Sequence, residues 1–386
     1  MIVITRRLAK RLKTVFRQAL DITTRREWPI VQLAGGPQGL RIRCGNGQAA
    51  AEFHLEGEQP DETIFVPFEL FGDIEGGRDV PVEIQLQDEK VTVSWRDGSV
   101  PQLLQYDQPT VRSEHWPPTP EHFAENPPRL LKALADAGAT TDPDSSRYAL
   151  GCIQLRGDHG KVIATDGRQL LVEDGFEFPW DGDVLLPRSR LFASKQLPED
   201  ESVHVGKADD WLTLRVGPWT FCWRLNKDGR FPTVENHIQS PDVAVASVEM
   251  PPSDRRFLAD NLRQMPGDDT LQSPVTLDLN GTVAVRARGQ DAENPMEMVL
   301  TGATRHGEPI RMMTDRRYLA RAAQLGFERL HIFGDKQPML AADEYRRYVW
   351  AVLDARSCIE PTENMTRIES PVPGRAARVD PPHPRI

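Results

Sequence analysis

The sequence is poor in the features that several classes of protein require. It contains only four cysteines, Cys44, Cys152, Cys222 and Cys358, with no CxxC pair and no histidine at zinc-ligand spacing. No apolar run approaches the ~20 residues of a membrane span, and Arg6 and Arg7 end the N-terminal apolar run well before the length of a signal peptide. We therefore expect a reduced, cytoplasmic protein with no structural zinc and no membrane partner.

Catalytic signatures are also missing. The chain has no Walker A lysine motif, no GxSxG, no HExxH and no glycine-rich dinucleotide loop. Asp166, between Thr165 and Gly167, is typical of a turn residue rather than a catalytic acid. We therefore expect no catalytic activity, no cofactor and no metal, and an enzyme is the alternative from another class.

What the sequence does contain is a repeat of long period. Gly39, Gly160 and Gly281 are 121 residues apart, and each opens a strand-like run followed by a hairpin, a strand that leads into a short helix, and a second hairpin. Such a period is typical of one module used several times. The sequence predicts three modules, at 1–115, 116–243 and 244–359, and a disordered tail rich in proline and arginine at 360–386.

Each module is predicted to be of the α+β class, with two helices packed on antiparallel sheets. Segments such as 82–86 and 91–95 alternate apolar and polar residues, as half-buried antiparallel strands do. Helical periodicity and capping residues, Ser253 among them, predict the helices. They are expected at 5–20, 67–75, 126–138, 187–197, 252–265 and 315–326.

Charge is divided unevenly between these helices and the rest of the chain. The net charge of −10 alone argues against a nucleic-acid partner. The six predicted helices, however, carry 17 Lys or Arg and 7 Asp or Glu, which gives them +10 and leaves −20 elsewhere. If the helices share one side of the molecule, this distribution provides a positive wall that can face phosphates without reading bases.

The middle module carries motifs of a known family. In order and spacing, four segments resemble the middle-domain signature of the bacterial DNA polymerase III β subunit, the sliding clamp: Arg147-Tyr-Ala-Leu-Gly151, Ala164-Thr-Asp-Gly-Arg-Gln-Leu170, Leu186-Pro-Arg188 and Arg230-Phe-Pro232. Tyr348-Val-Trp-Ala-Val352 resembles the last strand of the clamp, and Met313-Thr-Asp-Arg-Arg-Tyr-Leu319 the entry to its final helix. The resemblance covers residues 1–357, and in the first module it consists of layout alone.

The resemblance implies the processivity fold and a non-catalytic role in DNA replication. A head-to-tail homodimer would close six modules into a ring around duplex DNA, with helices lining the hole, and would tether a replicative DNA polymerase subunit. A clamp loader would be a further partner. The alternative is a divergent, monomeric clamp-like paralogue that serves as a repair or interaction platform.

The DNA contacts implied are basic side chains on the helices and in one loop. Each taken alone is also typical of a solvated helix face, but their concentration on five of the six helices favours the DNA-binding interpretation. The candidates are Arg6, Lys10, Lys13, Arg17, Arg25, Arg26, Arg129, Lys132, Arg188, Arg190, Lys195, Arg255, Arg263, Arg316 and Arg321.

The resemblance also implies a pocket for extended partner peptides between the middle and last modules. Apolar side chains with one flexible methionine would form an adaptable groove, and the alternative is that Leu150, Leu170 and Leu353 only fill the core. The matching positions are Leu150, Thr165, Gly167, Arg168, Leu170, Phe231, Pro232, Val234, Pro338, Met339, Leu340, Val352 and Leu353.

The chain departs from the family pattern at three places. Ala351-Val-Leu-Asp354 stands where the family has Met-Pro-Met-Arg, and Arg168-Gln169 stands where it has His-Arg. Either the usual peptide motif is expected to bind weakly, or a different one is preferred. Pro101 falls in the last strand of the first module, where similar clamps form the dimer edge, and a proline cannot donate a ladder hydrogen bond there.

Overall fold

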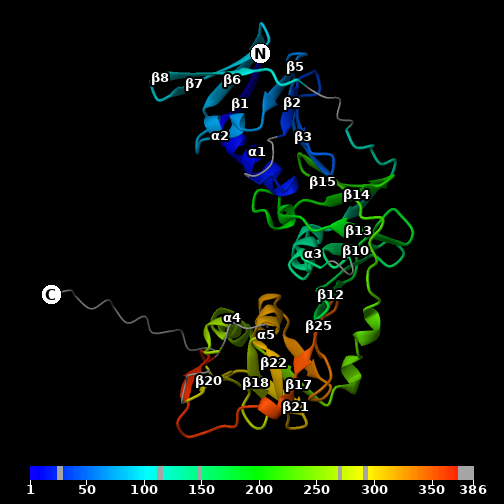
Figure 1. The fold of residues 1–386 in the computed structure, drawn as a ribbon, viewed down its shortest axis with the longest axis vertical. Helices are drawn as coiled ribbons and strands as arrows, with labels where there is room; N and C mark the ends of the chain where they lie inside the picture. Colours follow the sequence, from blue (N-terminus) through cyan, green and yellow to red (C-terminus); the bar gives the residue numbers. More distant parts are fainter. Residues whose placement is uncertain (24–28, 111–115, 146–148, 268–271, 290–293, 373–386) are drawn as a thin grey trace, which may run out of the picture. The chain divides into compact units, whose positions relative to one another are not determined.

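The computed structural model describes residues 1–386 except 24–28, 111–115, 146–148, 268–271, 290–293 and 373–386. Packing divides the chain into two compact units, which we describe separately (Figure 1). Unit 1 comprises residues 1–164 and 174–231, and unit 2 comprises residues 165–173 and 232–386. Both are mixed α+β with mostly antiparallel sheets, as the sequence predicts.

Unit 1 contains two complete sheets and a group of three further strands. The four-stranded sheet has the order β1 (Ile2–Thr5), β6 (Pro81–Gln87), β7 (Lys90–Asp97) and β8 (Val100–Asp107). The eight-stranded sheet has the order β5 (Thr63–Pro67), β2 (Ile30–Ala34), β3 (Leu40–Gly45), β4 (Ala49–Leu55), β16 (Trp219–Arg224), β15 (Trp211–Val216), β14 (Val203–Ala208) and β9 (Phe123–Asn126). Strands β13 (Asp183–Pro187), β10 (Cys152–Arg156) and β11 (Lys161–Thr165) lie side by side.

Unit 2 repeats this plan. One set of strands has the order β12 (Gln169–Glu173), β25 (Arg346–Trp350), β24 (Met339–Ala342), β23 (Arg329–Ile332), β17 (Ala246–Glu249) and β21 (Thr304–Gly307). A six-stranded sheet has the order β26 (Val352–Leu353), β22 (Arg311–Asp315), β18 (Pro274–Asp278), β19 (Ala284–Ala287), β20 (Met296–Val299) and β27 (Thr366–Glu369).

The strand orders confirm the threefold repeat. In each copy the first strand lies beside a meander of three later strands, in the orders β1-β6-β7-β8, β9-β14-β15-β16 and β17-β23-β24-β25. The remaining strands repeat as β5-β2-β3-β4 in the first copy and β22-β18-β19-β20 in the third. The three modules are therefore copies of one fold, and the boundaries 1–115, 116–243 and 244–359 stay predictions.

The glycines that revealed the repeat all have positive φ, at 123° for Gly39, 57° for Gly160 and 114° for Gly281. At Gly39 a Cβ would lie 2.2 Å from the carbonyl oxygen of Leu55, and at Gly160 it would lie 1.9 Å from that of Phe176. Only glycine combines this conformation with such a close approach.

Five α-helices occur in the described residues, and their bounds correct the predicted ones. They are α1 (Arg6–Ala19), α2 (Leu70–Ile74), α3 (Arg129–Gly138), α4 (Pro252–Asn261) and α5 (Arg316–Gln324). Short 3₁₀ turns are η1 (Arg190–Ala193), η2 (Glu235–His237), η3 (Pro241–Val243), η4 (Leu262–Gln264) and η5 (Ala355–Ser357). The prediction of a full helix at 187–197 is wrong, because Ser189 and Ser194 are extended and leave room for η1 only.

Two further predictions need correction. Ser253 does not cap α4, whose N-cap is Pro251 with no side-chain hydrogen bond. The tail is not disordered throughout, because Thr366–Glu369 forms strand β27 against β20.

Candidate nucleic-acid interface

Helix α1 separates an apolar face from a basic one. Thr5 caps the helix by accepting a hydrogen bond from the Leu8 amide at 3.1 Å. The buried face, centred on Leu12 and Phe16, packs edge-to-face against Trp219 of β16, with the Phe16 and Trp219 ring centroids 6.1 Å apart. Burial of each such large side chain contributes about 1.5–3 kcal/mol, so the opposite face is fixed toward solvent.

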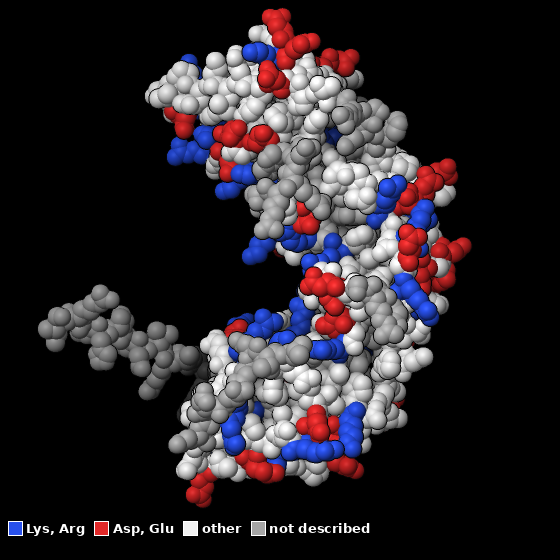
Figure 2. All heavy atoms as spheres, viewed as in Figure 1, with Lys and Arg blue, Asp and Glu red and all other residues white. Residues whose placement is uncertain are grey.

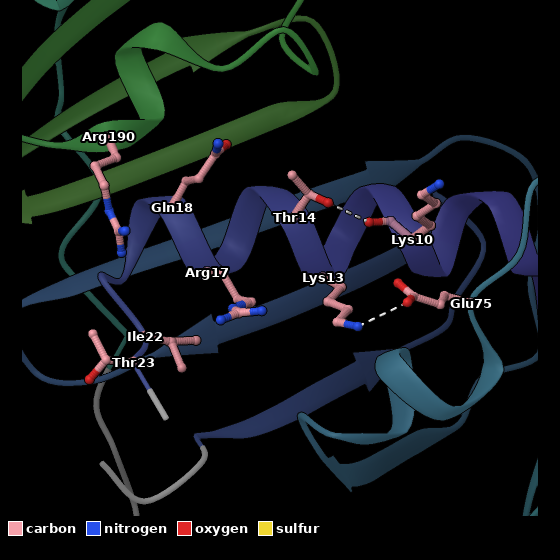
Figure 3. A pocket seen from close by; sticks show the side chains of 9 residues that line it. All are labelled: Lys10, Lys13, Thr14, Arg17, Gln18, Ile22, Thr23, Glu75 and Arg190. Carbon is pink, nitrogen blue, oxygen red and sulfur yellow. Dashed lines mark hydrogen bonds and ion pairs between the residues drawn. The ribbon is translucent and has the colours of Figure 1, made fainter. Parts of the chain in front are cut away.

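A hollow of about 540 Å³ runs along this solvent face (Figure 3). Among the described residues, its lining contains four cations and one carboxylate. The residues that line it are Lys10, Lys13, Thr14, Arg17, Gln18, Ile22, Thr23, Glu75 and Arg190. The cations come from α1 and from η1, which are far apart in sequence, so the fold gathers positive charge here.

Two of the four cations have carboxylate partners. Lys13 Nζ lies 3.0 Å from Glu75, which follows α2, and Arg190 lies 2.6 Å from Asp21. Among the described residues, none forms an ion pair with Lys10 or Arg17. These two side chains are therefore free to meet an anion. Exposed cations on a helix face attract a phosphate backbone without base recognition.

Other cations on α1 are held by the protein itself. Arg6 donates to the carbonyl oxygens of Ile74 at 3.1 Å and Glu75 at 3.0 Å, and its guanidinium lies 5.7 Å from the centre of the Trp95 ring. Arg11 donates to the Gln196 carbonyl and lies over Trp219. Burial lowers the pKa of the Arg11 guanidinium, and the charge of Glu201 opposes that shift. Both arginines therefore brace α1.

The other predicted DNA contacts of unit 1 also divide into side chains held by the protein and side chains exposed to solvent. Arg129 donates to the carbonyl oxygens of Asp174 and Gly175 and lies 4.4 Å from the centre of the Phe176 ring, so it fixes the N-terminus of α3. Lys132 forms an ion pair with Asp136 one turn away. Arg188 and Lys195, on either side of η1, are exposed.

In unit 2, Lys and Arg side chains gather over α4 and α5 (Figure 2). Arg316 is only 6% exposed and donates to the backbone carbonyl of Met265, so the expectation that it faces DNA is not met. Arg255 pairs with Glu328 at 3.0 Å and donates to the Gly326 carbonyl. Arg263 is exposed and Arg321 is half-buried.

Arg25 and Arg26, the predicted loop contacts, lie outside the described residues.

The predicted peptide-pocket residues of unit 2 do not share one face. Leu170 lies opposite Val349, which lies opposite Leu340, so these three occupy one face of neighbouring strands. Met339 lies opposite Trp350, one position along, and its side chain is 0% exposed within the core of unit 2. Successive strand residues point to opposite faces, so Met339 cannot be the flexible wall of a groove with Leu170.

The remaining predicted pocket residues differ in exposure. Thr165 is buried and accepts a hydrogen bond from the Gly167 amide at 3.0 Å, which places Arg168 at an exposed turn. Within unit 2, Val234 is buried, whereas Pro232, Pro338, Val352 and Leu353 are half-buried. Leu150 and Phe231 belong to unit 1, where Leu150 is buried and Phe231 half-buried.

Sequence reasoning missed the polar residues between the cations of the α1 hollow. Thr14 and Gln18 lie one and two turns after Lys10, and Thr14 donates to the Lys10 carbonyl at 2.9 Å. The spacing of four residues from Lys10 to Thr14 and from Thr14 to Gln18 could have predicted this, because residues four apart lie on the same face of a helix.

Within the described part of the chain, no cluster of three or more His, Cys, Asp or Glu is arranged to hold a metal ion. The helices in that part of the chain are all too short or too polar to cross a membrane.

Comparison with solved structures identifies the fold. The beta subunit from DNA polymerase of Streptococcus pyogenes matches with a TM-score of 0.74 and 15% identity, covering 91% of this chain and 99% of that one. The DNA polymerase III subunit beta from Pseudomonas aeruginosa matches with a TM-score of 0.70 and 20% identity, covering 92% and 99%. The chain has the sliding-clamp fold. The DNA polymerase sliding clamp from Bacillus subtilis also matches, with a TM-score of 0.72 and 17% identity over 91% of this chain and 98% of that one.

No protein-family model and no curated protein matches the sequence. The fold is therefore shared with these sliding clamps at only 15–20% sequence identity. The α1 hollow and the exposed Arg263 of η4 are features of this sliding-clamp fold that can meet a polyanion.

Proposed function

We propose that the protein is a DNA sliding clamp. Two copies associate head to tail into a closed ring around duplex DNA, and the ring tethers a replicative DNA polymerase subunit and other partners without catalysing a reaction. A clamp loader opens the ring. The four cysteines, none of which forms a disulfide, fit the predicted cytoplasmic location.

The observation that carries this proposal is the repeated pairing between modules. The fourth strand of the first module, β4, pairs with the last strand of the second, β16, and β12 of the second module pairs in the same way with β25 of the third. Both pairings are antiparallel. Continuing the series, β20 of the third module pairs with β8 of the first module of another copy. A heterologous contact of this kind generates a ring when the rotation closes.

Strand β8 has the character of an edge that receives a partner. It is the last strand of its sheet, and Val100 and Leu103 are 58% and 63% exposed. Apolar side chains on an open strand edge favour pairing with another chain. Pro101 lies in β8, as the sequence predicts, opposite Arg96 of β7, and a proline supplies no backbone amide hydrogen to a ladder.

The α1 hollow supports the DNA partner. Its free cations, Lys10 and Arg17, can each neutralise a phosphate, and the described residues that line it include no aromatic side chain that could stack on a base. Contacts of this kind are independent of sequence and weaken with salt, which allows a ring to slide.

Partner peptides are proposed to bind unit 2 where half-buried apolar side chains adjoin an exposed turn. Pro338, Val352 and Leu353 supply the apolar surface, and Arg168 supplies the charge. Asp354 caps η5 by accepting a hydrogen bond from the Arg356 amide at 3.1 Å, so this acid has a structural task as well. The peptide preferred here would differ from that of clamps with a basic residue at this position.

A monomeric interaction platform is the second candidate. It is favoured by β27, which pairs with β20 on the side where a second copy would bind. A monomer with the sliding-clamp fold would retain DNA and peptide contacts but could not encircle a duplex.

Salt-dependent binding to a short duplex tests the DNA contacts. Replacing Lys10 and Arg17 together by alanine removes two phosphate contacts, so the slope of log K against log salt should fall in magnitude by about 1.8. Fluorescence anisotropy over a salt series measures it.

Arg7→Ala is the matched control, because Arg7 lies on the same helix but pairs with Asp79 at 3.0 Å outside the hollow. Its salt slope should stay that of the unmodified protein. An unchanged slope in the double variant would mean that Lys10 and Arg17 of α1 do not contact DNA.

A further inference from the structure

The C-terminal segment runs back to the far edge of the six-stranded sheet of unit 2. After β26 at one edge, it makes contacts with β18 and β19 and then forms β27 beside β20 at the other edge (Figure 1, red). Pairing is parallel, with Met296 opposite Thr366 and Val299 opposite Glu369. Without β27, β20 would be the last strand of this sheet.

The position taken by β27 is the one that the repeat reserves for another module. Strands β4 and β12, the equivalents of β20, each pair with the last strand of the following module. In the third module the equivalent side of β20 is covered by the chain's own C-terminal segment instead. Parallel β27 and an antiparallel β8 from a second copy require the same backbone groups of β20, so the two cannot bind together.

A buried polar residue anchors the end of β27. Ser370 is 2% exposed and donates to Asp254 Oδ1 at 2.7 Å, while the Thr301 amide donates to Ser370 Oγ at 2.8 Å. The Ser370 amide also donates to the Val299 carbonyl at 2.9 Å. Such bonds are costly to leave unmade once the groups are buried, so they give the segment one defined docked position.

A second anchor lies earlier in the segment. The Ile359 amide donates to Thr276 Oγ1 at 2.8 Å, and Arg286 donates to the Ile359 carbonyl at 3.3 Å. Arg286 is itself held in a buried cluster with Asp278 and Glu297. The chain is therefore fixed on the sheet before it reaches β20, which raises the local concentration of β27 at that edge.

The strand between these anchors is lightly held. Thr366, Arg367 and Glu369 are exposed, and only Ile368 packs against the core. Arg367 interacts with Glu297 at 3.7 Å and with Glu369 at 3.0 Å across exposed surface, where ion pairs contribute little. A four-residue strand of this kind can leave β20 while Ile359 stays bound.

We propose that β27 is a built-in cap on the ring-closing edge. The proposal rests on the proposed function, because it takes β20 as the edge at which a second copy binds. In the monomer β27 and Ser370 occupy that edge, and a partner's β8 must displace them for the ring to close. The two states then exclude each other, because β20 pairs with β27 in the capped monomer and with β8 of the second copy in the closed ring.

The test compares the oligomeric state of three chains by sedimentation velocity over a concentration series: residues 1–386, 1–372 and 1–361. The chain 1–372 keeps β27 and Ser370, whereas 1–361 lacks both but keeps Ile359. Removing the cap should lower the dimer dissociation constant by about a hundredfold, since both copies must be uncapped to close the ring and a competent fraction of about one tenth in each raises the apparent constant by the square of ten. The chains 1–386 and 1–372 should agree.

A point variant checks the result without truncation. Ser370→Ala in the full chain should strengthen dimerisation in the same direction by a smaller factor, and should speed hydrogen exchange of the Met296–Val299 amides. Ser357→Ala, at an exposed position in η5, is the matched control and should change neither.

The outcomes separate the cap from the ring. Equal dimerisation of 1–386 and 1–361 would overturn the cap and leave the ring in place. Absence of dimers in all three chains would overturn both. If 1–361 dimerises more tightly than 1–372 and 1–386, the result supports both the cap and the ring.

Discussion

Individual arginines in this protein perform two different tasks, and burial distinguishes them. Arg316 is inside the protein, where its guanidinium donates to the carbonyl oxygens of Met265 and, at 3.4 Å, Pro266. Arg17 lines the α1 hollow and has no carboxylate partner among the described residues. Both fit the same sequence pattern of a basic residue on a helix, yet only Arg17 can meet a phosphate.

Replacing Arg316 by alanine should therefore affect stability but not DNA binding, and replacing Arg17 should affect DNA binding but not stability. Arg316→Ala leaves buried carbonyls without a charged donor and should lower the free energy of unfolding by about 2–3 kcal/mol, with an unchanged salt slope for DNA binding. Arg17→Ala should change stability by less than about 0.5 kcal/mol and reduce the slope. Urea unfolding and anisotropy measure the two effects. A stable Arg316→Ala protein with a reduced slope would contradict this division.

The sequence could predict the basic stripe on α1 but not which of its cations are free. Helical spacing placed Lys10, Lys13 and Arg17 on one surface, and the hollow contains all three. Lys13 is neutralised by Glu75, 62 residues away, through a contact that only the tertiary fold creates. Met339 escaped prediction for a similar reason, because its face of the sheet depends on strand register.

At the scale of elements, the ends of helices show how far local chemistry determines structure. Thr5 caps α1 through its side chain, whereas α4 begins at Pro251 and Pro252 without any side-chain cap. Proline suits the first turn because it lacks the amide hydrogen that would otherwise need a partner.

Alanine substitutions at the two helix starts should differ accordingly. Thr5→Ala removes the acceptor for the Leu8 amide and should lower the free energy of unfolding by about 1 kcal/mol. Ser253→Ala removes no cap and should cost less than about 0.5 kcal/mol. Chemical denaturation of both variants measures the difference, and similar losses would mean that the Thr5 hydrogen bond contributes nothing specific.

Elements that depend on distant partners were the hardest to predict. Strands β6 and β7 follow from apolar alternation, which is local. Strand β27 has no such pattern, and it forms because the exposed edge of β20 supplies hydrogen-bonding groups. The segment 187–197 shows the reverse, since apolar residues at helical spacing are overridden by extended serines on both sides of η1.

At the scale of the whole molecule, the period of the sequence predicted the architecture better than any single motif. A repeat of 121 residues requires the same strands to recur in the same order, and the sheets do so. The sequence could not predict that β20, the equivalent of β4 and β12 in the third module, would be covered by the chain's own β27. Under the proposed function, ring closure would therefore depend on two chains and on the C-terminal segment together.

Topological retention on DNA tests the central claim most directly. The full chain is equilibrated with a nicked plasmid circle or with the same plasmid linearised, and bound protein is separated by gel filtration at about 0.2 M salt, where simple phosphate contacts are weakened. A capped fraction lowers loading on both DNAs equally and leaves their ratio unchanged. A ring should stay on the circle and leave the linear DNA through its ends, so retention on the circle should be at least several-fold higher. Equal retention on the two DNAs would contradict encirclement.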